Sequence, residues 1–169
     1  MLQFIPTSEA PLIVRDGGRR RYRPATAEQI PAVARQVIDR KMQRGTSLES
    51  PADVRSYLGV MLAGYDYKVF SLLLLDTRHR LIEYVELSRG TIDGASVRPR
   101  EVVRETLRVN AAAAIFTHNH PSGNPEPSHA DELITLRLKD ALVLIGVRTL
   151  DHIIVAGDKT TSFAERGLL

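Results

Sequence analysis

Two histidines, a serine and an aspartate lie close together in the second half of the chain, and these residue types can bind a metal ion. His118 and His120 are separated by one residue. Ser128 follows eight residues after His120, and Asp131 follows three residues after Ser128. Two imidazoles and a carboxylate are three protein ligands, the number that a catalytic zinc site uses when its fourth position holds water. The spacing therefore indicates a metal site of this kind.

The segment before the histidines must bring them together. The second half of the apolar run Ala111–Phe116 predicts a buried strand, although its alanines leave a helix open as the alternative. In a strand, residues i and i+2 point to the same side, so His118 and His120 would project together and Asn119 would face away. Pro121 favours this arrangement, because it biases the preceding residue toward extended backbone angles.

A stiff turn and a helix follow the histidines. Residues 121–127 contain three prolines and Gly123, which is typical of a turn that reverses the chain. Ser128 suits the N-cap of the next helix and Asp131 its third position, so Asp131 could face the end of the strand. The same two residues also fit an ordinary capping box that needs no metal. Local sequence alone leaves both interpretations open.

The composition fits one globular domain without cysteine chemistry. The chain has 169 residues, of which 43% are hydrophobic, and no cysteine. Thiolate nucleophiles and cysteine-ligated zinc sites, including those of the nucleobase deaminases, are therefore excluded. No apolar stretch approaches membrane-spanning length and the N-terminus lacks a signal-peptide pattern, so we expect a soluble cytoplasmic protein that does not contact a membrane.

Positive charge is concentrated near the N-terminus. Residues 1–45 carry nine Lys or Arg against four Asp or Glu, whereas residues 46–169 carry fourteen against sixteen. The excess comes mainly from five arginines: Arg15, Arg19, Arg20, Arg21 and Arg23. Such an arm could contact the phosphate backbone of a nucleic acid or an acidic partner. A solvated arm is the simpler interpretation, since no DNA-reading motif accompanies the arginines.

The whole pattern predicts a mixed α/β fold in which helices flank a small sheet. Residues 1–25 are expected to be irregular. Helices are predicted at 26–44, 51–64, 101–109 and 128–145, and strands at 68–76, 80–87, 114–116, 150–155 and 160–163. Ser50, Pro51 and Asp53 form a strong start signal for the second helix. The strand at 68–76 is almost continuously apolar, as is typical of a central strand covered on both faces.

Three further histidines are not expected to take part in chemistry. His79 lies in a polar turn and should be exposed to solvent, and His129 lies on the first turn of a helix and should point outward. His152 stands beside Asp151 in a predicted strand, where neighbouring side chains face opposite sides of the sheet. We therefore expect a structural role for His152.

The spacing of these residues resembles the His-x-His-x7-Ser-x2-Asp motif of the JAMM (MPN+) metallopeptidases. Longer stretches are similar to the RadC-like branch of that family. These stretches are Gly90-Thr91, Val97-Arg98-Pro99-Arg100-Glu101-Val102, Asn110-Ala111-Ala112, His118-Asn119-His120-Pro121-Ser122-Gly123 and Asp151-His152-Ile153-Ile154-Val155. The resemblance runs from about Ser50 to Leu169. It implies an α/β fold of the MPN (JAB/JAMM) type, a cytidine-deaminase-like mixed sheet flanked by helices. Residues 46–169 would form this domain, and residues 1–45 a basic arm with one helix.

The resemblance also implies an activity. A zinc ion would be held by His118, His120 and Asp131, and Ser128 would support the developing oxyanion or position the water. The implied reaction is hydrolysis of a peptide or isopeptide bond in a protein or peptide substrate. Zinc lowers the pKa of its bound water, and a glutamate upstream in the family takes the proton.

The chain departs from the family at that general base. The glutamate begins the first core strand two residues before an aromatic residue, which corresponds to Phe70, so its position is occupied by Lys68. A protonated lysine is a donor and cannot accept a proton from water. Glu83 and Glu86 on the neighbouring strand are candidate substitutes. Asp66 is a third candidate, although it lies one pleat repeat of roughly 7 Å from Lys68.

The N-terminus is a second departure. Long RadC proteins carry a helix-hairpin-helix region there, and residues 1–45 contain no glycine-containing hairpin motif of that kind. The chain therefore resembles a short form of the family. Two alternatives to a hydrolase follow from the departures: a catalytically weak or inactive metal-binding scaffold, and a DNA-associated accessory protein that uses the Arg15–Arg23 arm. A homo-oligomer that pairs through the helix at 26–44 is also compatible with the sequence.

Overall fold

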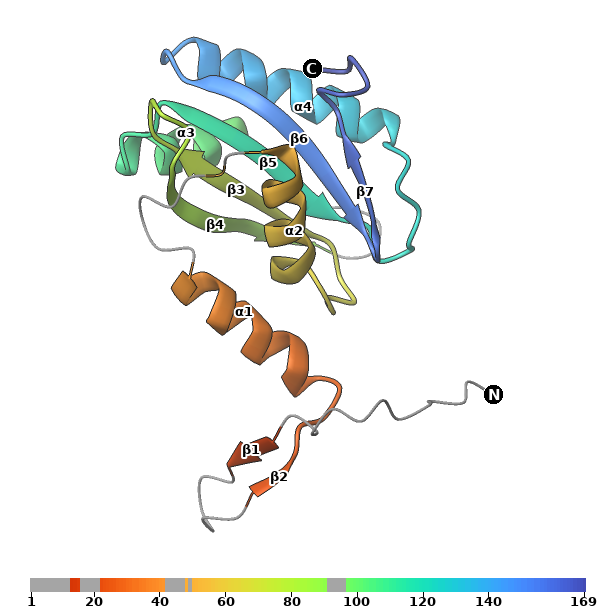
Figure 1. The fold of residues 1–169 in the computed structure, drawn as a ribbon. Helices are drawn as coiled ribbons and strands as arrows, with labels where there is room; N and C mark the ends of the chain where they lie inside the picture. Colours follow the sequence, from red (N-terminus) through yellow and green to blue (C-terminus); the bar gives the residue numbers. More distant parts are fainter. Residues whose placement is uncertain (1–12, 16–21, 42–47, 49, 91–96) are drawn as a thin grey trace.

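The computed structural model describes residues 13–15, 22–41, 48, 50–90 and 97–169, and most of them form three layers (Figure 1). A five-stranded sheet in the order β4-β3-β5-β6-β7 lies in the middle. Its strands are β3 (Val69–Leu75), β4 (Leu81–Arg89), β5 (Ala113–Asn119), β6 (Arg148–Ala156) and β7 (Lys159–Ser162). The helices of the described part are α1 (Gln29–Lys41), α2 (Pro51–Met61), α3 (Pro99–Arg108) and α4 (His129–Val143). The mixed α/β fold predicted from the sequence is confirmed.

The two faces of the sheet carry separate apolar cores. Helix α2 covers one face and packs on Leu73, Ile115 and Val155. Helices α3 and α4 cover the other face, where Leu72 and Phe116 are fully buried. Each strand therefore sends alternate side chains into different cores. The face under α3 and α4 is the one on which the predicted metal ligands lie.

The sheet is mixed in direction. Strands β5 and β6 run parallel, and the connection between them passes through α4. Strand β3 pairs antiparallel with both β4 and β5, and all seven of its residues are buried. Burial of all seven side chains confirms the prediction of a central strand covered on both faces.

The alanine-rich segment before the histidines forms a strand. The strand expected in the second half of Ala111–Phe116 is confirmed, but β5 is longer: it begins at Ala113 and continues to Asn119, so it contains His118. It lies between β3 and β6, so neighbouring backbones on both sides bind its amide and carbonyl groups. This pairing outweighs the helical propensity of alanine, which is worth less than 1 kcal/mol per residue.

Helix α2 begins at the capping box that the sequence predicts. The Asp53 amide donates to Ser50 Oγ at 3.2 Å, and the Ser50 amide donates to Asp53 Oδ2 at 3.0 Å. Pro51 occupies the first turn, where a missing amide hydrogen costs nothing. The cap therefore fixes the point at which the chain enters the α2 layer.

Replacing Ser50 with alanine should lower the free energy of unfolding by about 1 kcal/mol, because the Asp53 amide loses its acceptor at the helix end. Urea denaturation followed by circular dichroism measures this loss. Ser56→Ala is the matched control, since Ser56 is exposed within the same helix and its change should stay within about 0.5 kcal/mol. Equal losses in the two variants would contradict the assigned cap.

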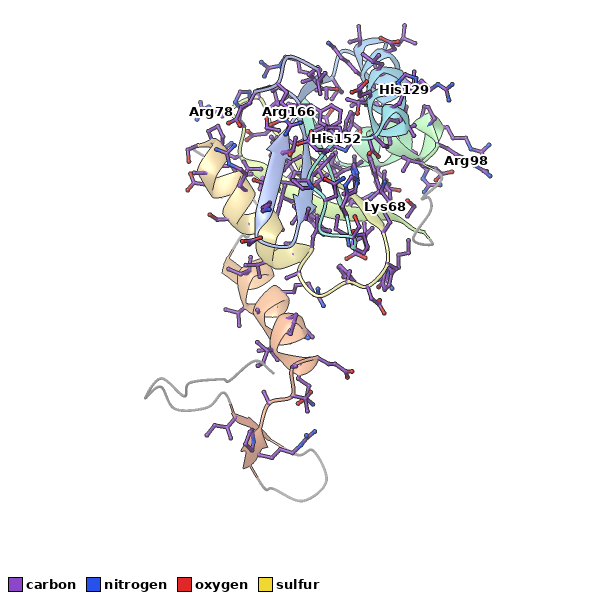
Figure 2. All side chains as sticks on the ribbon, turned by 90° about the vertical axis from the view of Figure 1, so that its right-hand side faces the viewer. Lys68, Arg78, Arg98, His129, His152 and Arg166 are labelled. Carbon is purple, nitrogen blue, oxygen red and sulfur yellow. The ribbon has the colours of Figure 1, made fainter. Side chains whose placement is uncertain are left out.

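The three histidines outside the proposed metal site differ in their exposure to solvent. His129 lies on the outer surface of α4, as predicted, whereas His152 lies within the fold (Figure 2). The prediction of an exposed His79 is wrong. Its side chain is half-buried, and His79 Nε2 lies 3.1 Å from the Arg148 guanidinium, because the β3–β4 turn packs beside the start of β6.

The N-terminal part contains more regular structure than the sequence indicated. Strands β1 (Ile13–Arg15) and β2 (Tyr22–Pro24) pair antiparallel, so the expectation of an irregular segment is wrong for these residues. This ribbon and α1 project away from the five-stranded sheet in Figure 1. Arg19, Arg20 and Arg21 lie outside the described residues, and the phosphate-binding arm stays a prediction, as does the domain boundary at residue 45.

Helix α1 is attached to the loop after α2. Pro31 packs on Gly64, where a Cβ atom would come within 3.2 Å of the proline ring. The Arg35 guanidinium lies over the Tyr65 ring, 4.4 Å from its centroid. Within the part of the chain that the structure describes, neither α1 nor any other helix is long and apolar enough to span a membrane.

Candidate metal centre

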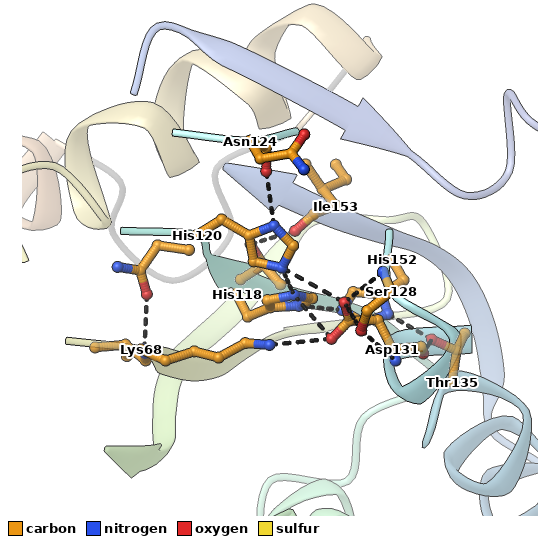
Figure 3. A network of polar contacts seen from close by, with 12 residues as sticks. Lys68, His118, His120, Asn124, Ser128, Asp131, Thr135, His152 and Ile153 are labelled. Atoms are coloured by element: carbon orange, nitrogen blue, oxygen red, sulfur yellow. Dashed lines mark hydrogen bonds and ion pairs between the residues drawn. The ribbon is translucent and has the colours of Figure 1, made fainter. Parts of the chain in front are cut away.

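Three side chains converge where β5 ends and α4 begins (Figure 3). One ligand atom from each of His118, His120 and Asp131 lies within 4.8 Å of the others. The two imidazole Nε2 atoms are 2.9 Å apart, and the Asp131 carboxylate oxygens lie 3.2 Å from His118 Nε2 and 3.4 Å from His120 Nε2. The side chains of His118, His120 and Asp131 are 1%, 13% and 7% exposed, so the cluster is closed except at His120. The structure thus brings the three residues proposed from the sequence into one group that could hold a metal ion.

Strand alternation places the two histidines together. His118 projects from β5 toward α4, and His120 follows directly after the strand. Asn119 faces the other way, and its side chain ties β5 to the segment before β3. Asn119 Oδ1 accepts from the Val69 amide at 2.6 Å, and Asn119 Nδ2 donates to the Tyr67 carbonyl at 2.9 Å. The expected opposite orientation of Asn119 is confirmed.

Ser128 and Asp131 form a helix cap and part of the cluster at the same time. Asp131 donates its backbone amide to Ser128 Oγ at 3.2 Å, and Asp131 Oδ2 accepts from the Ser128 amide at 2.9 Å and from Ser128 Oγ at 2.6 Å. These bonds occupy Asp131 Oδ2 and fix the carboxylate plane. The other oxygen, Oδ1, is turned toward His118. The two interpretations that the sequence left open are therefore compatible.

Lys68 enters the same cluster. Its side chain is 18% exposed, and Lys68 Nζ lies 3.0 Å from Asp131 Oδ1. Lys68 immediately precedes β3 and lies on the strand face that carries Phe70. The position that the family resemblance assigns to a general base thus holds a cation that pairs with the carboxylate of the cluster.

The three acidic residues proposed as substitutes for the base lie elsewhere. Asp66 is exposed and makes no contact with the cluster. Glu86 accepts from the Tyr65 hydroxyl at 2.8 Å on the α2 side of the sheet. Glu83 pairs with Arg108 at 2.9 Å, and it lies four residue pairs from the cluster along the ladder, roughly 13 Å at 3.3 Å per residue. None of the three reaches the cluster.

Two residues that sequence analysis missed stand behind His118. His118 Nδ1 lies 2.8 Å from His152 Nε2, and His152 Nδ1 lies 2.6 Å from Thr135 Oγ1. A signal for Thr135 was present, since it follows Asp131 by four residues and must share its helix face. No comparable signal existed for His152, because its position depends on how β6 pairs with β5. The structural role expected for His152 is therefore incomplete.

Burial and hydrogen bonding shift the pKa values of His118, His152 and Asp131. Burial lowers the pKa of the His118 imidazole to about 4, although the Asp131 carboxylate acts in the opposite direction. Burial also holds the pKa of His152 well below its ordinary range. Burial alone would raise the pKa of the Asp131 carboxyl, but its close contacts with His118, His120 and Ser128 outweigh burial and hold this pKa far below its ordinary value. Neutral imidazole and ionised carboxylate are the forms that bind a metal.

The orientation of His120 is set by backbone. His120 Nδ1 lies 2.8 Å from the Asn124 carbonyl oxygen. Because a carbonyl can only accept, the His120 proton is on Nδ1, and Nε2 directs a lone pair into the cluster. An imidazole lone pair and a carboxylate are donors that zinc accepts, so the residues present fit such an ion.

Comparisons with known proteins agree with this geometry. The sequence model described as a RadC-like JAB domain matches residues 48–168. A UPF0758 protein of Vibrio cholerae is 54% identical over 136 residues, which cover 80% of this chain and 85% of that protein. A UPF0758 protein of Thioalkalivibrio sulfidiphilus is 54% identical over 145 residues, or 86% of this chain and 65% of that protein. One of Marinobacter nauticus is 55% identical over 137 residues, or 81% of this chain and 61% of that protein. The match thus spans less than two thirds of the two longer relatives.

Proposed function

Because the chain belongs to the RadC-like JAB domain family, we propose that it is a zinc-dependent hydrolase of the JAMM type that cleaves peptide or isopeptide bonds. The observation that carries this proposal is the convergence of His118, His120 and Asp131 at one point of the fold. Two imidazoles and one carboxylate form the donor set of catalytic zinc sites, which leave one position open. We also propose that the protein acts in the cytoplasm, as expected from the sequence.

In this proposal each residue of the cluster has a separate role. His118 and His120 would bind the ion through Nε2, and Asp131 through its carboxylate. When bound, zinc lowers the pKa of a water molecule to near neutrality and polarises a carbonyl group. Ser128 orients Asp131 through its hydroxyl and amide and lies at the edge of the cluster, from which it could also bind an oxyanion.

A metal-binding domain without hydrolysis is the second candidate, and Lys68 favours it. The ammonium group stands 3.0 Å from Asp131 Oδ1, at the position where the family places a base. A protonated amine cannot take a proton from water. It also competes with a dication for the same carboxylate. Among the described residues, Asp131 is the one carboxylate in the cluster, and its oxygens are already engaged.

Metal analysis combined with cleavage assays separates the two candidates. The chain purified with zinc present should contain one zinc ion per chain by mass spectrometry. For the hydrolase, fluorogenic peptide and isopeptide reporters should be cleaved, and a chelator should stop cleavage until zinc is restored. Zinc binding without cleavage would support the second candidate. A chain that retains no zinc, cobalt or manganese would contradict both.

A further inference from the structure

A chain of three hydrogen bonds runs behind the proposed metal position (Figure 3). It leads from His118 Nδ1 to His152 Nε2 at 2.8 Å, and from His152 Nδ1 to Thr135 Oγ1 at 2.6 Å. It ends where Thr135 Oγ1 donates to the backbone carbonyl of Asp131 at 2.5 Å. The chain thus joins two of the three proposed ligand residues by a path that does not pass through the metal position.

The hydrogen bond at the Asp131 end of this series has a fixed direction. The Asp131 carbonyl oxygen has no proton and can only accept. The single hydroxyl proton of Thr135 is therefore spent on that carbonyl, and Thr135 Oγ1 is left as an acceptor. The contact with His152 Nδ1 is a hydrogen bond only if that nitrogen carries the proton.

The position of the proton on His152 determines the position of the proton on His118. A neutral imidazole has one ring proton, so His152 with its proton on Nδ1 has a bare Nε2. His152 Nε2 must then accept from His118 Nδ1, which places the proton of His118 on Nδ1. His118 Nε2 is left as a lone pair that points into the cluster, as metal ligation requires.

The surroundings of His152 prevent other arrangements. The residue is fully buried, so water does not replace either partner. Its ring stacks on Phe163 with centroids 4.7 Å apart and meets Phe70 and Phe116 edge-on at 5.6 and 5.9 Å. Phenylalanine offers no hydrogen-bonding group. The position of the His152 proton is therefore decided by its two polar neighbours.

We propose that Thr135 and His152 are positioning residues, which hold His118 in the tautomer that leaves Nε2 free to bind the metal ion. This inference rests on the proposed metal site but not on hydrolysis. His120 needs no such pair, because the Asn124 backbone carbonyl sets its tautomer. The two histidines thus obtain the same protonation pattern from different sources, one from the backbone and one from two specific side chains.

The threonine hydroxyl is the part that can be removed with least change of shape. Valine in place of Thr135 keeps the volume and removes the acceptor for His152 Nδ1–H. A buried N–H group without a partner costs about 1–3 kcal/mol, so His152 should move its proton to Nε2. His152 would then donate to His118 Nδ1, and the proton of His118 would move to Nε2, where it blocks the lone pair.

The test compares Thr135→Val with Thr135→Ser, which keeps the hydroxyl and loses the methyl group. Long-range ¹⁵N–¹H NMR of the histidine rings in the metal-free chain identifies the tautomer of His118. Wild type and Thr135→Ser should carry the proton on Nδ1, and Thr135→Val should carry it on Nε2. Zinc affinity, measured by competition with a chromophoric chelator, should fall about 10- to 100-fold in Thr135→Val and stay within about threefold in Thr135→Ser.

Several results would overturn the inference. A wild-type His118 with its proton on Nε2 contradicts it without use of any variant. Zinc affinity that falls in Thr135→Ser and not in Thr135→Val would assign Thr135 a packing role instead. Thr135→Ala, which also lacks the hydroxyl, replaces Thr135→Val if valine prevents folding. A wild-type chain with the expected tautomer but no zinc affinity would contradict the proposed function while leaving the hydrogen-bond direction confirmed.

Discussion

Replacement of Asp131 with asparagine should weaken zinc binding by more than about 100-fold, beyond what loss of a residue that merely supports a ligand costs. The carboxylate is the anionic member of the cluster, and an amide carries no charge to offset that of a dication. Asparagine has nearly the same shape and can still accept from the Ser128 amide. The helix cap should therefore survive, and the loss should reflect ligation rather than unfolding.

Chelator competition and calorimetry with zinc measure this loss. Asp140→Asn is the matched control, because Asp140 is an exposed aspartate of the same helix outside the cluster. Its zinc affinity should equal that of wild type within about threefold, since the change leaves every proposed ligand in place. Equal zinc affinity in Asp131→Asn and Asp140→Asn would remove Asp131 from the proposed ligand set.

Exchange of Lys68 for glutamate should raise zinc-dependent cleavage of a peptide or isopeptide reporter by about 10²- to 10⁴-fold, the usual contribution of a general base. The exchange puts a carboxylate where an ammonium group now stands 3.0 Å from Asp131 Oδ1. A carboxylate can accept the proton of an attacking water molecule, and an ammonium group cannot. Initial rates at saturating zinc, with and without chelator, measure the gain.

Lys68→Met separates the two effects of the lysine. Methionine is similar in length and uncharged, so it removes the cation that competes for Asp131 without adding a base. Zinc affinity should rise about tenfold, as expected for one competing contact of about 1.4 kcal/mol, while cleavage stays at the wild-type level. Equal cleavage by Lys68→Met and Lys68→Glu would show that the lysine acts only by its charge. No cleavage by either variant would favour the metal-binding domain without hydrolysis.

The elements around the site were predictable where short-range rules decide them. Because side chains alternate along a strand, His118 and His120, which are two positions apart, were predicted to point to the same side. The orientation of Asp131 follows from the helix cap that it forms with Ser128. The start of α2 at Ser50 has the same origin. In each case the atoms that interact are within a few residues of one another, so the order of residues along the chain fixes the contact.

Two other features were mispredicted, each for a different reason. His79 was expected to be exposed, but its turn packs beside Arg148, which is 69 residues away. The β1–β2 ribbon was missed because three residues a strand carry too short a pattern to recognise.

By itself the sequence determined the proposed ligand set of His118, His120 and Asp131, the cap that orients the carboxylate, and the family. Only the tertiary structure decided what surrounds these ligands. Lys68 reaches Asp131 across 63 residues, and His152 reaches His118 across 34. Those contacts depend on the alignment of β3 and β6 on either side of β5, which is set by the packing of two apolar cores against the sheet. A shift of one residue in either strand would turn Lys68 or His152 to the opposite face, away from the cluster.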